Sequence, residues 1–531
     1  MSIAKKLASQ TATYGVSSIV GRVLSYLLVP IYTGHFVPAE YGVVTALYAY
    51  VSFMNVLFTY GLETTFLRFA NRPGADRREL YNRMLTMLFI SSIVLTAILC
   101  LLARPLAGLL HLPPGTENYI VWMALILGLD AVVALPFARL RLENKARKFA
   151  TIRLFNILVY VGLNLFFVVL CPAVERSAPG SLLAGLRPLV SALYNPDLGI
   201  GYIFLSNLIA SALTLVALWR ELLDFRLRWP SLEFLRPILA YSLPLMLMGL
   251  AGIANETLDR LMLPVYLPKG FYPGLSSEAA NGVYGACYKL SIFMSLVIQA
   301  FRYAAEPFFF AQSTEKNSPA TFALVLKWFT LCCTFIFIGI SLNLSWIGPL
   351  FLRSSVYRTG LGVVPILLLA NLFLGVYYNL SVWFKLTDKT YFGTYIGAAG
   401  AVLTVVLNLL LIPVLGYMGS AWATLACYFM MAALCWWLGE RHFPVPYPMG
   451  RLLLWLLGAV GLVVAGQAGI QALSKSKEAG YALGLGLPLI FIALVYLIEG
   501  RQLRRATPLV PQYEPKGQKK TPSNTRCLSE L

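Results

Sequence analysis

Long apolar runs recur along the whole chain and are separated by short polar segments. A helix that crosses the hydrocarbon core of a bilayer needs roughly 20 apolar residues, and most of these runs reach that length. The pattern predicts an all-α, polytopic membrane protein with about fourteen spanning helices. The predicted spans lie near residues 11–34, 42–62, 84–103, 118–138, 152–171, 198–219, 238–266, 282–301, 321–346, 361–384, 391–412, 418–438, 451–472 and 481–498.

The segments between these runs are short, and none is long enough for a soluble domain. The longest, residues 172–197, contains the sequence GSLLAGLRPLVSALY, whose apolar spacing is typical of a helix that lies in the membrane interface. The C-terminal segment, residues 501–531, is basic, contains proline and has few apolar residues. We therefore predict that it is a disordered cytoplasmic tail.

Lys and Arg residues are distributed unevenly between the two sets of alternating segments. Of the 42 Lys and Arg residues, 30 fall in the set that includes the N-terminus and 8 fall in the other set. Positive residues are retained on the cytoplasmic side of a membrane, so both termini are predicted to be cytoplasmic. The net charge of +19 follows from this topology, and no basic domain for nucleic acid is indicated.

Composition supports the membrane assignment and gives no sign of catalysis. The chain is 58% hydrophobic and 12% charged, whereas soluble proteins carry about 25% charged residues. The eight Cys residues form no CxxC pair, so neither a metal site nor a disulfide framework is expected. The sequence has no HExxH, GxSxG or P-loop motif, so we predict neither an enzyme nor a cofactor.

Short matches at a nearly constant offset indicate an internal repeat. Between residues 42 and 54, six of thirteen positions match at an offset of 240 residues: Gly42 with Gly282, Val43 with Val283, Ala46 with Ala286, Tyr48 with Tyr288, Phe53 with Phe293 and Met54 with Met294. Many transporters are built from such repeats. We predict two six-helix bundles, residues 1–225 and 226–440, related by a parallel repeat, and two added helices in residues 441–500.

Seven charged residues fall in the interior of predicted spans, away from their first and last residues: Arg22, Asp130, Glu256, Asp259, Arg260, Lys289 and Lys327. A charge near the bilayer centre costs about 2.5 to 3.5 kcal/mol even on the lenient insertion scale, so it normally faces protein or water. Lys327 is only about two turns from the cytoplasmic end of its span. We expect its long side chain to snorkel to the interface.

Glu256 is three residues from Asp259 and four residues from Arg260. This spacing places all three side chains on one face of a helix. Two interpretations remain open. In the first, Arg260 binds an anionic phosphate and an acid takes up a coupling ion. In the second, Glu256 simply pairs with Arg260. Asp130 or Asp259 would then neutralise Arg22 across the bundle.

Arg22 and Lys289 are predicted to face a cavity, because Arg and Lys suit phosphate and the repeat places their helices at matching positions. Asp130, Glu256 and Asp259 are candidates for coupling to H+ or Na+, or for ion pairing.

Pro244 and Pro264 bracket the charged stretch of the seventh predicted span. Proline removes a backbone hydrogen bond and can kink a helix. This makes the helix the best candidate for a bending gate, and ordinary kinks without a gating role remain the more common alternative.

Four segments resemble the polysaccharide-export branch of the multidrug/oligosaccharidyl-lipid/polysaccharide flippase superfamily. They are VPAEYGVV at 37–44, YSLPLMLMGLAGIANETLDRLML at 241–263, GVYGACYKLSIFMSLVIQAFRYAAEPFFF at 282–310 and GYMGSAWATLACYF at 416–429. The helix with Pro followed by Asp-Arg is the most specific mark, and the resemblance covers roughly residues 5–500. It implies two six-helix bundles around a central cavity that opens alternately to either side.

The resemblance also implies a function. The cargo would be an oligosaccharide on undecaprenyl pyrophosphate, flipped from the cytoplasmic to the outer leaflet of a bacterial inner membrane. It would serve the synthesis of a surface polysaccharide such as O-antigen (lipopolysaccharide), capsule or exopolysaccharide. The partners implied are membrane lipids and the polysaccharide polymerase machinery, and the two added helices favour a lipid flippase over the usually twelve-helix drug antiporters.

Two alternatives remain: a cation-coupled multidrug exporter of the same superfamily, and a membrane polysaccharide polymerase or ligase. A drug exporter should bind cationic amphiphiles through acids, which would leave Arg22 and Lys289 without a purpose. A polymerase should show a large outer loop with catalytic Arg or His, whereas the outer segments hold only 8 basic residues.

Overall fold

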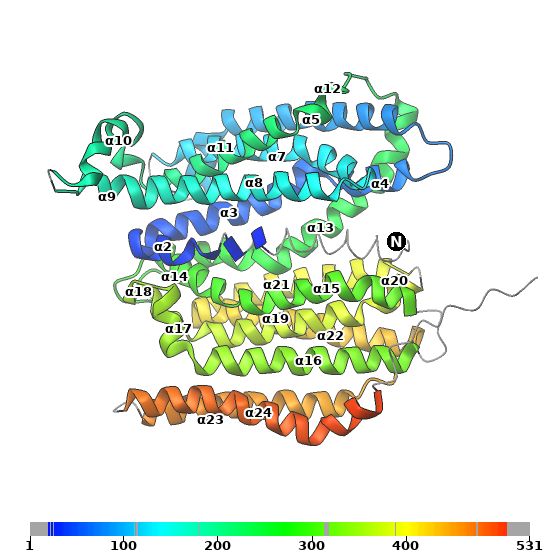
Figure 1. Cartoon of the computed structure of the whole chain (residues 1–531). Coiled ribbons are helices and arrows are strands. Elements are labelled where there is room, and N and C mark those ends of the chain that lie inside the picture. Colours follow the sequence, from blue (N-terminus) through cyan, green and yellow to red (C-terminus); the bar gives the residue numbers. More distant parts are fainter. Residues whose placement is uncertain are drawn as a thin grey trace, which may run out of the picture.

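The computed structural model describes residues 20–506, apart from 22, 25, 111, 113–114, 179, 313–317, 388 and 474–475. The described residues form helices joined by short loops, and no strand occurs among them. Most helices run side by side along a common axis (Figure 1). The all-α prediction is confirmed.

The helices that precede residue 225 form the N-terminal group, drawn blue to green in Figure 1. Within it, α7 packs on α5 and on α11, and α8 packs on α11. Their bounds are α2 Val29–His35, α3 Pro38–Thr59, α4 Leu62–Ala70, α5 Arg77–Leu101, α6 Ala103–Leu109, α7 Glu117–Leu142, α8 Ala146–Asn164, η1 Leu165–Leu170, α9 Cys171–Glu175, η2 Leu182–Leu186, α10 Arg187–Leu193, η3 Pro196–Leu198, α11 Gly201–Ala217 and α12 Trp219–Leu223.

The C-terminal group comprises α13 to α22, and α23 and α24 follow it. α19 and α21 both pack on α22, and α16 packs on α19. The bounds are α13 Leu232–Tyr266, α14 Ser277–Leu290, α15 Ile292–Gln312, α16 Ser318–Leu342, α17 Leu344–Phe351, α18 Ser355–Arg358, α19 Val363–Leu380, α20 Val382–Leu386, α21 Tyr391–Leu415, α22 Tyr417–His442, α23 Met449–Ala472 and α24 Lys477–Ala506.

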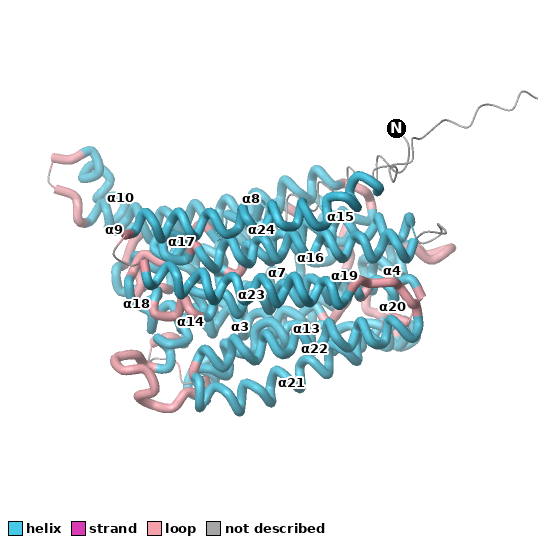
Figure 2. The backbone as a smooth tube through the Cα atoms, turned by 90° about the horizontal axis from the view of Figure 1, so that it is seen from below, coloured by secondary structure: helices cyan, strands magenta, loops and turns pink. Residues whose placement is uncertain are grey.

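The two groups meet along α3, α13 and α14. α13 contacts α3 on one side and α21 on the other, and α14 packs against α3. The loops gather at the two ends of the bundle, and α9 and α10 project from one of them (Figure 2). We call the end with the Arg-rich loop between α4 and α5 the basic end, and the end with α2, α17 and α18 the far end (Figure 1).

Eleven described helices are long and apolar enough to cross a membrane, and a twelfth span is obtained if the pair Ser277–Leu290 and Ile292–Arg302 counts as one. The predicted count of fourteen is not confirmed. α11, predicted as a span at 198–219, has 17 residues. At 1.5 Å per residue it is about 26 Å long, shorter than the roughly 30 Å hydrocarbon core. The first predicted span, 11–34, lies partly outside the described residues.

α24 ends later than the span predicted for it, because the helix continues to Ala506. The segment predicted as a disordered tail is thus helical over its first six residues, 501–506. The sequence RQLRRA has no Gly or Pro to stop a helix, and the first breaker is Pro508. Residues 507–531 lie outside the described residues.

The predicted snorkelling of Lys327 is wrong. Its side chain is 4% exposed, and its ammonium group pairs with Glu499 of α24, which is fully buried. A carboxylate from a helix far along the chain neutralises the lysine inside the protein, so the side chain has no need to reach the interface. The pair fastens α24 to α16.

The span predicted at 282–301 is broken. α14 and α15 meet at Ser291 at an angle of 46°. Ser291 Oγ donates to the backbone oxygen of Tyr288 at 2.8 Å, and such local bonds compete with the regular helix ladder. Asn371 of α19 donates its Nδ2 to Ser291 Oγ at 3.3 Å, so a neighbouring helix holds the break.

Candidate functional site

The charged residues of α13 point in different directions. Asp259 is buried, with 2% of its surface exposed, whereas Glu256 is exposed. Arg260 Nε lies 3.7 Å from Asp259 Oδ1. Arg260 Nη2 donates to the backbone oxygen of Glu256 at 3.0 Å. Among the described residues, Arg260 therefore pairs with Asp259, and the side-chain pair Glu256–Arg260 of the second interpretation is not found.

Aromatic side chains of α14 hold this pair in place. Tyr284 OH donates to Asp259 Oδ2 at 2.5 Å, and Tyr284 is fully buried. The guanidinium carbon of Arg260 lies 3.7 Å from the ring centroid of Tyr288. A buried ion pair is tolerable only when further hydrogen bonds satisfy its atoms, and Tyr284 supplies one. The pair therefore joins α13 to α14.

We expect Asp259→Ala to lower the free energy of unfolding by about 3 to 5 kcal/mol, because it removes the carboxylate that neutralises Arg260. Unfolding of the purified protein in detergent would measure this. Glu256→Ala is the matched control, since that carboxylate is exposed, and we expect it to cost about 0.5 kcal/mol or less. Equal losses in both variants would show that Asp259 does not stabilise Arg260.

The other predicted charges are placed apart from this pair. Asp130 lies near Ser211 of α11 and within electrostatic range of Arg153 of α8, both in the N-terminal group. Lys289 is exposed, and its Nζ lies 5.1 Å from the ring centroid of Tyr26. Arg22 lies outside the described residues.

Pro244 and Pro264 both lie inside α13, which runs as one helix from Leu232 to Tyr266. The sharp break in this region lies at Ser291, between α14 and α15, where the sequence contains no proline. A gating role for the two prolines stays a prediction.

A cavity of about 130 Å³ lies beside the charged stretch of α13. Its lining side chains are Tyr26, Glu256, Tyr288, Ser291, Ile292, Ser295, Ile298, Gln299, Arg302, Asn371, Leu374, Tyr378 and Tyr428. Eight of these carry a hydroxyl or amide group, and only Glu256 and Arg302 carry a charge. The lining is therefore polar but close to neutral.

Arg302 is a cavity residue that the sequence analysis missed. Its guanidinium carbon lies 4.0 Å from the ring centroid of Tyr378. None of the ion pairs found in the described part of the chain involves Arg302. Stacking on a ring fixes the plane of a guanidinium and leaves its N–H edges for a ligand. Because the predicted span ends at residue 301, Arg302 falls among the loop cations in the sequence.

Ser295, Gln299 and Arg302 share one face of α15, because they are four and three residues apart. Ser295 Oγ donates to Asn371 Oδ1 at 3.2 Å. Gln299 Oε1 is buried without a hydrogen-bond partner among the described atoms. A buried unsatisfied group costs about 1 to 3 kcal/mol, and a water molecule or a ligand hydroxyl in the cavity would satisfy it. This polar spacing is the signal that could have identified the face from sequence.

The two groups are in close contact at the far end. Thr33 Oγ1 donates to the backbone oxygen of Phe351 at 3.0 Å and accepts from the backbone N–H of Arg353 at 3.3 Å. Tyr357 OH donates to the backbone oxygen of Phe36 at 2.9 Å. These contacts join α2 and the loop after it to α17 and α18.

α3 and α14 cross at the far end with their backbones touching. A Cβ atom at Gly42 would stand 1.9 Å from the carbonyl oxygen of Glu278, and one at Gly282 would stand 1.9 Å from that of Pro38. Asn281 Nδ2 also donates to the backbone oxygen of Gly42 at 3.3 Å. The two contacts are reciprocal. At the 240-residue offset found in the sequence, Gly42 corresponds to Gly282 and Pro38 corresponds to Glu278. Only glycine permits so close an approach.

The sequence model of a family described as "Polysaccharide biosynthesis protein" matches residues 7–312, which is more than half of the chain. A comparison with curated proteins gives no match.

Solved membrane-protein structures share the fold at low sequence identity. "Lipid II flippase MurJ, inward closed conformation" matches with a TM-score of 0.67 and 12% identity, over 93% of this chain and 99% of that one. A MATE family transporter of the MOP superfamily in an inward-facing conformation gives 0.60 and 13%, over 79% and 94%. The MATE multidrug transporter DinF-BH gives 0.59 and 16%, over 83% and 96%.

Proposed function

Because the chain belongs to the polysaccharide biosynthesis protein family and has the fold of the MOP superfamily, we propose that it is a lipid-linked oligosaccharide flippase. In this proposal it carries an undecaprenyl-pyrophosphate-linked oligosaccharide from the cytoplasmic to the outer leaflet of a bacterial inner membrane. The family match and the shared fold confirm the superfamily resemblance stated from the sequence. The cargo and the membrane belong to the proposal.

The cavity is the observation that carries this proposal. Hydroxyl and amide groups suit a sugar headgroup, since they both donate and accept hydrogen bonds. Arg302, stacked on Tyr378, supplies N–H donors that suit phosphate. The cavity volume of about 130 Å³ is below the roughly 300 to 1,000 Å³ of typical ligand sites. Loading therefore requires the two groups to move apart at the basic end.

Transport needs no bond to be made or broken. The polar headgroup would pass through the cavity while the polyprenyl tail stays in lipid. Outward movement of two negative charges across an inside-negative potential of 100 mV contributes roughly 4 to 5 kcal/mol. Coupling to H+ or Na+ is compatible with this proposal. Glu256 is then the best-placed acid, since it lines the cavity while Asp259 is held by Arg260 and Tyr284.

A cation-coupled drug exporter is the second candidate, and the same carboxylate favours it. Glu256 is the one acid in the cavity lining and could attract a cationic amphiphile. The two functions make opposite predictions for the charges, because an exporter needs Glu256 and a glycan-phosphate flippase needs Arg302.

Deletion of the gene in its host tests the proposed function. A lipid-linked saccharide should accumulate on the cytoplasmic face, which lipid extraction and mass spectrometry would identify, and the amount of polysaccharide at the cell surface should fall. Normal surface glycan without accumulation, in a host that has no redundant transporter, would refute the proposal.

Arg302→Ala should reduce flipping by about tenfold or more, because it removes a charge-assisted hydrogen bond worth about 1.5 to 3 kcal/mol. The rate can be measured with the accumulated saccharide lipid in proteoliposomes. Arg302→Lys should recover part of the rate, since it keeps the charge but not the planar fork. Arg104→Ala, which changes an exposed arginine of α6, is the control. A wild-type rate in Arg302→Ala would exclude Arg302 from the headgroup site.

A further inference from the structure

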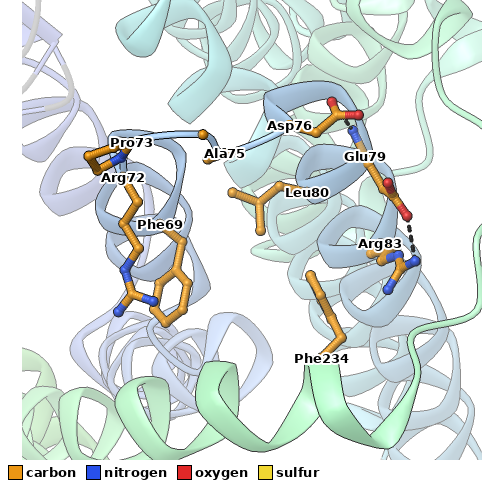
Figure 3. Close-up of a pocket in the computed structure, with 10 residues that line it drawn as sticks. Phe69, Arg72, Pro73, Ala75, Asp76, Glu79, Leu80, Arg83 and Phe234 are labelled. Carbon is orange, nitrogen blue, oxygen red and sulfur yellow. Dashed lines mark hydrogen bonds and ion pairs between the residues drawn. The ribbon is translucent and has the colours of Figure 1, made fainter.

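A second hollow lies at the basic end, away from the central cavity (Figure 3). It has a volume of about 440 Å³, within the roughly 300 to 1,000 Å³ range of ligand sites. It forms where the loop between α4 and α5 approaches the first turn of α13. The lining residues are Phe69, Arg72, Pro73, Gly74, Ala75, Asp76, Glu79, Leu80, Arg83 and Phe234.

Arg72, which lines the hollow, and Arg68, which lies beside it on α4, are both stacked on aromatic rings. The guanidinium carbon of Arg72 lies 3.8 Å from the ring centroid of Phe69, and that of Arg68 lies 4.2 Å from the ring centroid of Tyr241 on α13. The two rings pack edge to face, with centroids 6.2 Å apart. The order is guanidinium, ring, ring, guanidinium. The two cations thus lie at opposite ends of the stack, and each keeps a fixed plane and has N–H edges of the kind that suits phosphate.

The acids of the hollow are already engaged. Asp76 caps α5, where Oδ1 accepts from two backbone N–H groups at 2.9 and 3.0 Å. Glu79 pairs with Arg83, and Figure 3 shows both contacts on the wall opposite Arg72. Neither Arg68 nor Arg72 has a carboxylate partner in the part of the chain that the structure describes. Their positive charge is therefore not compensated locally.

The surroundings add to this positive charge. Residues 68–83 contain five Arg and two acidic residues. Nearby on the chain, the segment before α13 and its first turns contribute Arg226, Arg228 and Arg236. An anion that approaches this end of the bundle therefore meets an attractive potential.

The length of α13 indicates that the hollow reaches the depth of lipid headgroups. α13 has 35 residues, so it is about 52 Å long at 1.5 Å per residue, whereas a bilayer with its headgroups measures about 40 to 45 Å. Both ends of α13 therefore extend to the polar region. Phe234 and Tyr241 belong to its first three turns, and the basic end is the one predicted to face the cytoplasm.

We propose that this hollow binds the phosphate of an anionic lipid headgroup, with Arg72 as its donor and the uncompensated charge of Arg68 on neighbouring α4 adding to the attraction. The cytoplasmic leaflet carries a negative surface potential from such lipids, which matches the charge of the hollow. The stack joins α4 of the N-terminal group to α13 of the C-terminal group. A bound headgroup thus braces a contact between the two groups at a place separate from the cavity.

Lipid retention by the purified full-length protein tests this site. Native mass spectrometry in detergent, with phosphatidylglycerol or phosphatidylcholine added, would count bound lipids. We expect phosphatidylglycerol to bind, and the double variant Arg68→Gln/Arg72→Gln to bind it about tenfold more weakly. Arg72→Lys should be intermediate, because it keeps the charge without the stacked fork. Arg147→Gln, an exposed arginine in the first turn of α8, is the matched control.

Competition with inorganic phosphate distinguishes a lipid headgroup from free phosphate as the ligand of the hollow. Displacement of phosphatidylglycerol by inorganic phosphate would identify a site for free phosphate, and resistance to it would identify a lipid site. Equal retention of phosphatidylglycerol by wild type and the double variant, or equal retention of phosphatidylcholine and phosphatidylglycerol by wild type, would overturn the proposal. The assay measures lipid binding and not transport, so its outcome is independent of the proposed flippase activity.

Discussion

Gly42→Ala is expected to open the far end of the bundle. Its Cβ would stand 1.9 Å from the carbonyl oxygen of Glu278, a backbone atom that cannot rotate away. Close-packed interiors do not absorb such an overlap, so α3 and α14 must separate. Because the hydrogen bonds of Thr33 and Tyr357 lie at the same end, the separation should weaken them as well. The balance between conformations then shifts away from the closed far end.

Cysteine labelling would measure this shift without knowledge of the cargo. Ser295→Cys places a thiol in the cavity lining. A membrane-impermeant maleimide added on the far side should label this position about tenfold faster in the Gly42→Ala background, a shift of ~1.4 kcal/mol in the equilibrium. Quantifying the peptide that contains residue 295 avoids interference from the native cysteines. Flipping should fall as well, because the cycle requires the far end to close.

Two further alanine variants make the labelling result specific. Gly282→Ala should behave like Gly42→Ala, since the contact is reciprocal. Gly339→Ala on α16 adds a Cβ where no atom lies within 4 Å, so it should label like the wild type. Wild-type labelling in a folded Gly42→Ala protein would show that the α3–α14 crossing does not govern access from the far side.

The helices themselves could be predicted because the required information is local. A membrane span is a run of about 20 apolar residues, and that property is readable without knowledge of neighbouring helices. The bend at Ser291 could not be read in this way. It depends on Asn371, which lies 80 residues further along the chain. The count of spans has a different difficulty, because α11 is about three residues shorter than a full crossing.

The directions of the charged side chains depend on tertiary partners. Helical spacing places Glu256, Asp259 and Arg260 near one face, yet Asp259 turns toward Tyr284 of the next helix. The role of Arg302 was not predicted for a simpler reason, because this residue lies one position beyond the predicted span 282–301. The repeat also marks a contact of the folded chain, since the matched positions Gly42 and Gly282 approach each other closely where α3 crosses α14.

A buried ion cluster attaches the two added helices to the bundle. Glu499 of α24 is fully buried and pairs with Lys327 of α16. Its Oε1 also lies 2.6 Å from Arg451 Nε of α23 and accepts a hydrogen bond from Trp455 Nε1 at 3.1 Å. One carboxylate therefore holds side chains from two other helices. Because it compensates two positive charges, we expect it to contribute more to the free energy of unfolding than an isolated surface ion pair does.

Glu499→Ala should lower the free energy of unfolding by about 3 to 5 kcal/mol, because it removes the carboxylate that neutralises the buried Lys327. Unfolding in detergent would measure the loss, with Glu478→Ala, an exposed acid at the start of the same helix, as the control. The double variant Lys327→Met/Glu499→Leu removes both charges and should recover most of the stability. If it recovers stability but not flipping, the cluster has a role in transport beyond attachment. If Glu499→Ala costs no more than Glu478→Ala, the cluster does not hold α24 on α16.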